Sequence, residues 1–348
     1  MAYTTINKHT DYFDTKTFTG NASSQSITGL NFKPSLVWLK NRDSAYAHSL
    51  FDLHRGTNAR IRSESSNAQD NPSPSALTAF NSDGFTVGGD IGVNQNNEGI
   101  VGWNWYAADT AGSSNTDGSL NSYATTANTT AGFSIVSYTG TGSATTVGHG
   151  LGVEPAFIII KGLSGSSTNW QVYSKALDAD KFLEFNSTTA ELSQGTYNMF
   201  NSTRPTSTVF SLGTHGNTNA SGVNYIAYCF AEKTGYSKVG SYTGNGNNDG
   251  SFIYTGFKPS FAIFKRISGG DNDWILMDNK RDPHNLMRQT LYPNLNNAEA
   301  AVDRCDFLSN GIKLRGTSVA FNASGSPYIY MAFGQSLVGS NNTPCTAR

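Results

Sequence analysis

A short segment that occurs three times is the feature that most limits what this 348-residue chain can fold into. In each occurrence a proline is followed six residues later by a lysine, with an apolar run between them, and these Pro-to-Lys segments are residues 34–40, 155–161 and 259–265. An aromatic-Thr-Gly triplet stands 16 or 17 residues before each proline, beginning at Phe18, Tyr138 and Tyr242. Ordered features that recur at near-constant spacing indicate internal duplication. The chain therefore consists of three diverged copies of one unit, copy 1, copy 2 and copy 3.

Every copy closes on an aromatic run about 90 residues after its triplet, at residues 100–105, 225–230 and 328–333. Short runs rich in β-branched and aromatic residues, separated by Gly, Pro and Asn, are typical of strands. The dipeptides Asp83-Gly84 and Asn310-Gly311 are strong hairpin signals. This pattern predicts an all-β chain of three tandem β-sandwich units of the jelly-roll or concanavalin-like kind.

The expected boundaries follow from the repeat and from local composition. The three sandwiches are assigned to residues 1–106, 131–231 and 238–334, and residues 335–348 form a polar C-terminal tail. Residues 107–130 are rich in Ala, Gly, Ser, Asn and Thr, which favours a flexible linker between copies 1 and 2. The connection between copies 2 and 3 is short, so these two are expected to lie rigidly against each other.

Apolar residues at matched offsets in the repeats predict the core. They are Trp38, Trp105, Ile159, Phe230, Phe264 and Phe333. In the Pro-to-Lys segment, the proline is expected to begin a strand, where its missing N–H costs nothing, and the lysine is expected to end that strand at the solvent edge. The alternative is a lysine that binds a ligand.

Charge and hydropathy exclude several classes of partner. A formal net charge of −1 offers no basic surface to a phosphate backbone or an anionic membrane, so nucleic acid is not an expected partner. The sequence contains no stretch of about 18 apolar residues and no signal peptide at its N-terminus, so membrane insertion and secretion are not expected. Cys229, Cys305 and Cys345 share no short spacing, which argues against a disulfide framework or a thiolate zinc site.

Common catalytic motifs are missing from the sequence. It contains no Gly-x-Ser-x-Gly, no His-Glu-x-x-His, no phosphate loop and no dinucleotide fingerprint. Among the histidines, His48 and His54 alone stand at a spacing that suits a metal, and surface-loop histidines are the alternative that we favour. We therefore expect no enzyme and no catalytic residue.

One loop matches the opening of a calcium site. Residues 245–250 place oxygen-bearing side chains at alternate positions, Asn245, Asn247 and Asp249, and supply a glycine for the sharp turn. The glutamate that closes such a site is replaced by Gly256. A tight Asn/Gly hairpin explains the same residues, so calcium is the one cofactor considered and no other is expected.

Two further groups in copy 3 are candidates for ligand or interface contacts. Asp271 and Asp273 stand beside Trp274, and acids next to an aromatic ring suit a sugar. The alternative is a polar hairpin tip before a strand whose tryptophan belongs to the core. Arg281 and Arg288 lie in a charged loop that is the best candidate for a protein interface.

Loops that diverge among the copies are expected to carry contacts with other molecules or subunit interfaces. They are residues 58–74, 187–205 and 282–297. The residues that the copies share are needed for the common fold. The loops in which the copies differ are therefore the places where functional contacts are expected.

Several segments resemble a domain family found in virion proteins of tailed bacteriophages, especially marine phages. They are residues 11–20, the Phe-Lys-Pro-Ser run at 32–35, residues 81–85 and the Gly-Trp-Asn-Trp run at 102–105. The resemblance is strongest over residues 1–106 and is legible through 333. That family is described as lectin-like jelly rolls of tail fibres or virion structural proteins, and it has no catalytic residues to carry over.

The resemblance implies a location on the virion. The expected function is that of a structural protein on the particle exterior, either a tail fibre or adhesin or a capsid knob or decoration protein. Its expected partners are other virion proteins, further copies of itself in a homo-oligomer, and a host surface glycan. The alternative is a secreted carbohydrate-binding or polysaccharide-degrading protein, against which the missing signal peptide counts.

Overall fold

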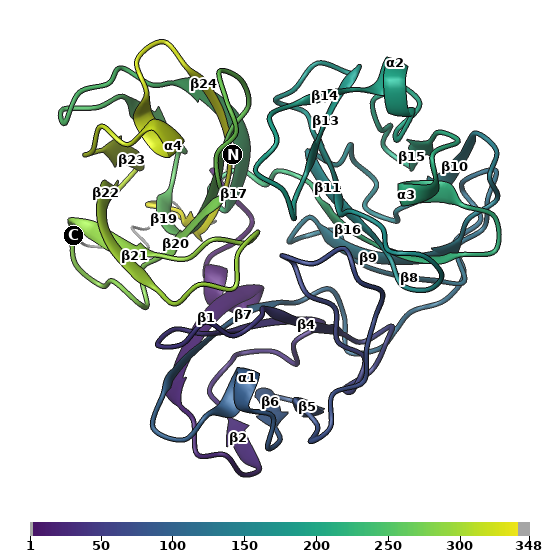
Figure 1. Cartoon of the computed structure of the whole chain (residues 1–348), viewed down its shortest axis with the longest axis horizontal. Coiled ribbons are helices and arrows are strands. Elements are labelled where there is room, and N and C mark those ends of the chain that lie inside the picture. The colour runs from purple at the N-terminus through teal and green to yellow at the C-terminus, as the bar shows by residue number, and fades with distance from the viewer. Residues whose placement is uncertain (1–2, 340–348) are drawn as a thin grey trace.

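The computed structural model describes residues 3–339 and is all-β, with several antiparallel sheets. Copy 1 contains η1 (His9–Asp11), β1 (Phe13–Thr19), β2 (Gln25–Ile27), β3 (Leu36–Asn41), β4 (Ser49–Asp52), β5 (Leu77–Asn81), β6 (Gly84–Val87), α1 (Ile91–Asn94) and β7 (Gly99–Trp105). Copy 2 contains β8 (Ala124–Asn128), β9 (Phe133–Thr139), β10 (Thr145–Gly148), β11 (Phe157–Gly162), β12 (Gln171–Ser174), β13 (Lys181–Glu184), β14 (Leu192–Ser193), α2 (Gln194–Tyr197), β15 (Val209–Leu212), α3 (Gly216–Asn219) and β16 (Asn224–Phe230). Copy 3 contains β17 (Ser237–Thr243), β18 (Phe252–Tyr254), β19 (Lys258–Arg266), β20 (Ile275–Asp278), β21 (Met287–Thr290), β22 (Ala300–Leu308), β23 (Gly311–Leu314), α4 (Val319–Asn322) and β24 (Pro327–Gln335). Figure 1 shows the copies as three lobes around a common centre.

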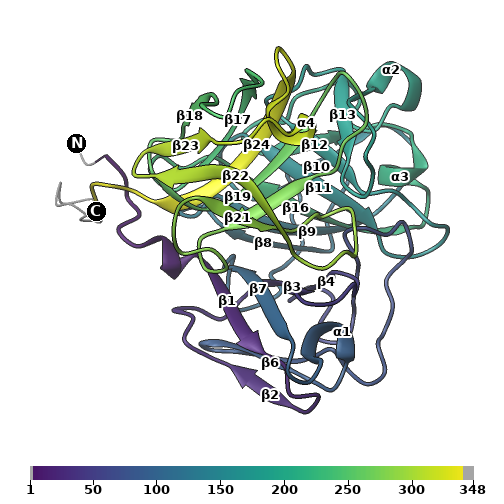
Figure 2. The same cartoon turned by 60° about the vertical axis from the view of Figure 1, so that its left-hand side comes forward.

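Each copy is a sandwich of an inner and an outer sheet. The inner sheets contain the orders β1-β7-β3-β4, β9-β16-β11-β12 and β17-β24-β19-β20, so the strand with the Pro-to-Lys segment lies beside the closing strand every time. The outer sheets are β2-β6-β5, β10-β15 and β18-β23-β22-β21. In Figure 2, β2 and β6 lie at the outside of copy 1, with its inner sheet toward the other two copies. The three tandem sandwiches that the repeat predicts are therefore confirmed.

The register of the inner sheets is also the same in the three copies. Trp38 of β3 is paired with Trp103 of β7, and the corresponding pairs are Ile159–Tyr228 and Ile263–Met331. Side chains on a strand alternate between the two faces of a sheet. One face of each inner sheet therefore packs on its own outer sheet, and the other face points to the centre of the molecule. Covering both faces explains why the closing strands are apolar along almost their whole length.

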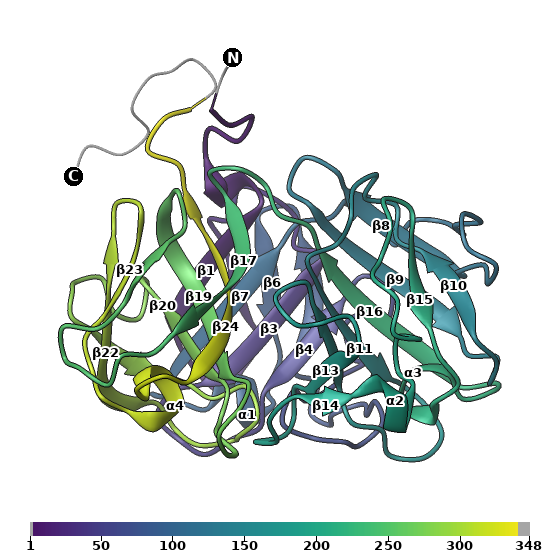
Figure 3. The same ribbon diagram turned by 90° about the horizontal axis from the view of Figure 1, so that it is seen from above.

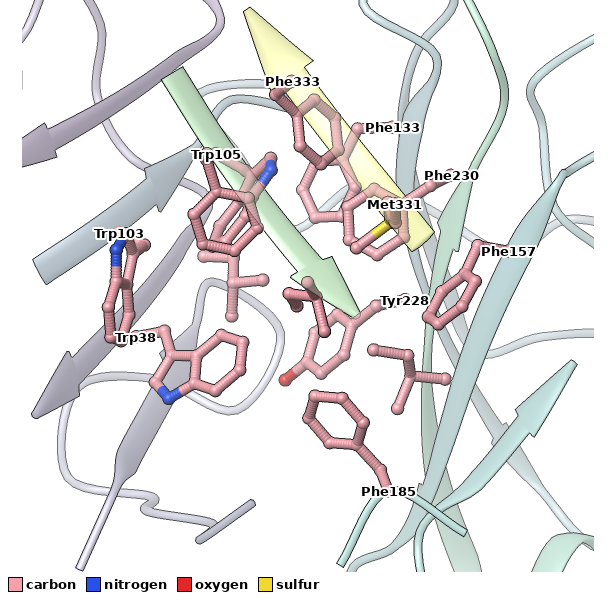
Figure 4. Close-up of a cluster of buried hydrophobic side chains, with 14 of the residues drawn as sticks. Trp38, Trp103, Trp105, Phe133, Phe157, Phe185, Tyr228, Phe230, Met331 and Phe333 are labelled. Carbon is pink, nitrogen blue, oxygen red and sulfur yellow. The ribbon is translucent and has the colours of Figure 1, made fainter. Parts of the chain in front are cut away.

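The inner sheets meet in one central core that belongs to all three copies. Figure 4 shows its rings, among them Trp38, Trp103, Trp105, Phe133, Phe157, Tyr228, Phe230 and Phe333. Trp105 of copy 1 packs edge-on against Phe230 of copy 2 and Phe333 of copy 3, with ring centroids 6.2 and 6.0 Å apart. The three copies are arranged in a ring around this core. The void left at the centre is about 20 Å³, so side chains fill the space between the copies.

All six residues predicted as core are buried, which confirms that expectation. Five of them, including Trp38 and Phe333, belong to the central core. Phe264 instead lies between the two sheets of copy 3.

The segment expected as a flexible linker is folded onto copy 2. Strand β8 pairs with β9 along its whole length, and Ser113 and Leu120 form bridges to Thr125 and Val147. The Thr- and Ala-rich composition suits this strand because it lies at the edge of the sheet and is only half-buried. At the other end of the chain, residue 335 belongs to β24, and residues 340–348, with Cys345, lie outside the described residues.

Copies 1 and 3 close the ring. His9 N donates a hydrogen bond to Gln335 Oε1 (3.0 Å), which joins the segment before β1 to the end of β24. Figure 3 shows this junction on one side of the molecule, whereas α1, α2 and α4 lie on the opposite side.

Candidate functional site

The lysine that ends each Pro-to-Lys segment is buried at a seam, our term for the contact surface between two copies. Lys40, Lys161 and Lys265 expose none of their surface, so the predicted solvent-edge position is wrong. Lys161 Nζ donates to Ser66 O of copy 1 (2.9 Å), and Lys265 Nζ donates to Thr188 O of copy 2 (2.7 Å). In copies 2 and 3 the lysine therefore ties the end of its strand to a loop of the preceding copy.

Burial lowers the pKa of these ammonium groups because the charged form loses its water. The pKa falls to about 7 for Lys161 and to about 8 for Lys40 and Lys265. Near Lys40, the carboxylates of Glu64 and Glu299 raise the pKa and offset part of the effect of burial. Burial also raises the pKa of Glu64 to about 7.

We expect the stability of the wild type relative to a Lys161→Met variant to increase between about pH 7 and pH 10. The folded-state pKa is depressed below the unfolded value of 10.5, so in this range the unfolded chain binds more protons and the free energy of unfolding increases with pH. The slope of the difference approaches about 1.4 kcal/mol per pH unit. Urea unfolding of both proteins at a series of pH values measures this difference in the free energy of unfolding. The contributions of other titrating groups are the same in both proteins and cancel in the difference. A difference that stays flat contradicts the expectation.

In each copy, the Pro-to-Lys strand pairs with the next strand of the inner sheet, which is β4, β12 or β20. The residue immediately before that next strand also makes a contact across a seam. The sheet registers place His48, Trp170 and Trp274 at this position. Trp274 Nε1 donates to Glu184 O of copy 2 (3.0 Å), and Trp170 Nε1 donates to Arg62 O of copy 1 (2.9 Å). His48 Nε2 lies 3.1 Å from Tyr292 O of copy 3. The contacts therefore run around the whole ring.

Of the candidate metal pair, His48 is not a surface residue, so that expectation is wrong for His48, whereas His54 lies in a partly exposed turn. His48 is fully buried, and its Nδ1 accepts from Trp38 Nε1 (2.8 Å). His54 of copy 1 contacts Ser137 Oγ (2.7 Å) and Thr126 Oγ1 (2.8 Å) of copy 2. Burial lowers the pKa of both imidazoles, which favours neutral rings that join the copies.

The seam between copies 3 and 1 contains a buried ion pair. Arg281 Nε lies 2.6 Å from Asp278 Oδ2, and Trp103 Nε1 of copy 1 donates to the same oxygen (2.9 Å). Arg281 also pairs with Glu299 (2.6 Å), and its guanidinium lies 5.6 Å from the centroid of the Trp103 ring. Arg281 was expected at an interface with another protein. That expectation is wrong, because the Arg281 side chain is fully enclosed within this chain.

The same arrangement recurs at the seam between copies 1 and 2. Asp52 pairs with Arg55 (2.6 Å) and accepts from the Tyr228 hydroxyl of copy 2 (2.7 Å). At the third seam the residues that correspond to the aspartate, the arginine and the ring donor are Ser174, Leu177 and Met331, and all three are buried. At this seam, uncharged residues thus replace the aspartate, the arginine and the aromatic residue that donates a hydrogen bond to the aspartate. Because all three are replaced, no unpaired buried charge is left.

Arg288, the second expected interface residue, is at the surface of copy 3. More than half of its side chain is exposed, and it pairs with the equally exposed Asp303 (2.6 Å). A role for Arg288 in contacts with another protein remains a prediction.

The acidic pair beside Trp274 lies at the seam between copies 2 and 3. Trp274 is 1% exposed, so the ring cannot stack on a sugar, and the hairpin-tip alternative is confirmed. Asp273 Oδ1 accepts from Asn294 Nδ2 (2.7 Å), and Asp271 Oδ1 accepts from Ala190 N of copy 2 (3.4 Å). The two carboxylates therefore position loops.

The calcium-like loop is held by an asparagine that recurs in every copy. Asn94, Asn219 and Asn322 end the single-turn helices α1, α3 and α4 and are fully buried. Asn322 Oδ1 accepts from Asn245 N (2.9 Å), and its Nδ2 donates to Asn247 O (2.9 Å). Asn94 and Asn219 hold the loops that follow the triplets of copies 1 and 2 in the same way.

The proposed calcium ligands already have partners. Asn245 Oδ1 accepts from Asn247 N (3.0 Å), Asn247 Oδ1 accepts from Asp249 N (2.9 Å), and Asp249 pairs with Lys313 (2.8 Å). Over residues 3–339, no group of three or more His, Cys, Asp or Glu is arranged to hold a metal ion. The geometry favours the tight-turn alternative.

The glycine of each aromatic-Thr-Gly triplet is required by a close approach to the turn after the same helix. A Cβ at Gly20 would lie 2.1 Å from Gln95 O, and a Cβ at Gly140 would lie 2.3 Å from Ala220 O. No side chain fits at such distances. The triplet therefore marks the fold and not a binding site.

A family model described as a domain of unknown function, DUF7483, matches residues 8–336. The chain belongs to this family. The DUF7483 model spans all three copies as one domain, which agrees with sandwiches that share a central core. No curated protein matches the chain. Within residues 3–339, no helix has the length and apolar character needed to cross a membrane.

Proposed function

We propose that this DUF7483 chain is a structural protein of the exterior of a bacteriophage particle. It acts by assembly and by surface or receptor contact, as a tail fibre or adhesin or as a capsid knob or decoration protein. Its partners are other virion proteins, further copies of itself and a glycan of the host surface. The resemblance of residues 1–106 to virion proteins of tailed phages supports this assignment.

The observation that carries the proposal is the closure of three sandwiches around one core. Hydrogen bonds made by buried side chains cross every seam, and two seams add buried ion pairs. Such contacts fix the relative orientation of the copies, because each buried polar group needs its partner. The result is a rigid body, which suits a particle exposed to the outside. Parts of the divergent loops, such as Ser66, Thr188 and Tyr292, make contacts across the seams, and the exposed parts of these loops remain for contacts with other molecules.

Homo-oligomerisation on the particle belongs to the proposal. A single contact through a loop of a β-sandwich is weak, and repeating it on linked copies raises the avidity by about 10² to 10⁴. A particle that carries many copies of this chain gains that factor without any new contact.

The test is the composition and shape of purified particles. Mass spectrometry of gradient-purified phage is expected to detect this chain, and cryo-electron microscopy is expected to show a three-lobed density on the particle exterior. A protein that is monomeric and absent from purified particles contradicts the proposal and favours the secreted carbohydrate-binding alternative.

We further predict that the protein does not cleave polysaccharides. The acidic pair considered beside an aromatic ring already has structural partners, because Asp271 accepts from Ala190 N across the seam to copy 2 and Asp273 accepts from Asn294 within copy 3. Incubation of pure protein with a panel of bacterial polysaccharides is expected to release no reducing sugar. Turnover that is lost on replacing Asp271 or Asp273 overturns this prediction.

A further inference from the structure

A surface cleft of about 360 Å³ lies on copy 2, beside a helix that the other copies lack. Its walls come from β13, from α2 and from the turn that begins α3. Figure 1 shows α2 above β13 and β14 at the outer edge of copy 2. In the described parts of copies 1 and 3, no helix lies between the inner-sheet strand β4 or β20 and the strand that corresponds to β15 (β6 or β23). The helix is therefore a feature of copy 2, and the divergent loop 187–205 that contains it supplies part of the lining of the cleft.

An exposed and well-held tyrosine forms the apolar side of this cleft. Tyr197, at the end of α2, is 40% exposed. Its ring packs at steep angles against Phe182 (5.9 Å, 83°) and His215 (5.9 Å, 76°). Contacts on two sides fix the ring before any ligand arrives, which lowers the entropic cost of binding. Phe182 and Met199, both buried, complete the apolar lining.

Polar groups with free bonding capacity form the other side. Glu184 Oε1 accepts from Asn169 Nδ2 (2.7 Å), while Oε2 has no hydrogen-bond partner among residues 3–339. His215 Nδ1 accepts from Asn217 N (3.1 Å), so the neutral ring carries its proton on Nε2. Glu184 Oε2, His215 Nε2 and the Asn217 side-chain amide thus provide an acceptor, a donor and a group that does both.

We propose that this cleft binds a neutral pyranose sugar. The C–H groups on one face of a pyranose carry partial positive charge and pack on the negative face of an aromatic ring, which Tyr197 offers. The hydroxyl groups of the sugar both donate and accept hydrogen bonds, which matches the acceptor of Glu184, the donor of His215 and the amide of Asn217 on the polar side of the cleft. No Lys or Arg lines the cleft, and Glu184 repels anions, so sialic and uronic acids are disfavoured. The volume lies at the small end of ligand pockets, roughly 300–1,000 Å³, and suits one or two sugar units.

The larger cleft on copy 3, about 620 Å³, is a poorer site. Its carboxylates are already paired, Asp303 with Arg288 (2.6 Å) and Asp306 with Arg315 (2.6 Å). A ligand there would have to break an ion pair, and no aromatic ring lines the cleft.

The sugar site stands on the geometry of copy 2. That the sugar belongs to a host cell surface rests on the proposed function. The two can fail separately, because sugar binding is measured with the pure protein and particle incorporation is measured on purified phage.

The experiment is saturation-transfer NMR with the full chain and methyl glycosides of glucose, galactose, mannose, N-acetylglucosamine and N-acetylgalactosamine. Methyl glucuronide and methyl sialoside serve as anionic comparators. The variants are Tyr197→Ala, which removes the ring, and Glu184→Gln, which removes the charge at constant shape. Tyr123→Ala is the matched control, because Tyr123 is 50% exposed on the same copy and does not line the cleft.

At least one neutral glycoside is expected to bind, with affinity lowered about tenfold or more in Tyr197→Ala and unchanged in Tyr123→Ala. Glu184→Gln is expected to weaken binding of the neutral sugar, because a charged acceptor makes the stronger hydrogen bond. The proposal is overturned if none of the neutral glycosides binds, if the anionic sugars bind better, or if binding survives Tyr197→Ala. Unfolding temperatures equal to that of the wild type show that the variants are folded, so a loss of binding in Tyr197→Ala is due to the missing ring.

Discussion

Replacing Arg281 with methionine is expected to lower the free energy of unfolding by about 3 to 5 kcal/mol. Removing one partner of a buried ion pair leaves the other charge in a medium that cannot solvate it. Here the abandoned carboxylate is Asp278, which exposes none of its surface, and Glu299 keeps Arg42 as its remaining partner (2.7 Å). Urea unfolding followed by circular dichroism measures the loss.

The matched control is Arg288→Met, which removes an arginine from an exposed ion pair in the same copy. Exposed pairs contribute about 0–1 kcal/mol, so this variant is expected to stay close to the wild type. The double variant Asp278→Leu/Arg281→Met is expected to recover part of the loss, since no buried charge is left unpaired. Equal effects of Arg281→Met and Arg288→Met would place Arg281 in water and contradict the buried pair.

The sequence was sufficient for the features that repeat. Three Pro-to-Lys segments at fixed distances from three triplets predict three sandwiches, and the same offsets identify core residues such as Trp105 and Phe230. Repetition works because each matched position samples the same local environment three times. It identifies positions within one copy and carries no direct information about the contacts between copies.

The seams were missed for that reason. Lys161 is buried because a loop of copy 1, some 95 residues away in the sequence, supplies the carbonyl of Ser66. The same holds for Arg281, whose environment includes Trp103. One sequence signal was nevertheless available. A closing strand such as residues 225–230 is apolar at consecutive positions, and this pattern indicates a strand that is covered on both faces.

The calcium-like loop shows how a local motif misleads. Asn245 and Asn247 suggested ligands because oxygen-bearing side chains alternate there. The better signal was Asn322, which stands eleven residues before the last aromatic of its copy, as do Asn94 and Asn219 in theirs. An asparagine kept at one place in three diverged copies indicates a structural bond, and in the structure it holds this loop. The proposed sugar-binding cleft had no such signal, because α2 has no counterpart in the described parts of copies 1 and 3.

The central core predicts that the three copies unfold together. Phe230 packs on Phe133 of its own copy, on Trp105 of copy 1 and on Phe333 of copy 3, at centroid distances of 4.9, 6.2 and 5.8 Å. Truncating a buried phenylalanine to alanine costs about 3 to 5 kcal/mol because it removes apolar contacts and leaves a cavity. For Phe230→Ala we expect a loss of this size, shared by all three copies.

Hydrogen exchange followed by mass spectrometry resolves the copies separately. In Phe230→Ala, the slowest amides of β7, β16 and β24 are expected to lose protection by similar amounts, because each exchanges through the same global opening. The control is Phe252→Ala in copy 3, where a ring that is 47% exposed is removed and stability is expected to change by less than about 1 kcal/mol. If β7 and β24 keep their protection while β16 loses it, the copies are independent domains, and the central core is only a contact between them.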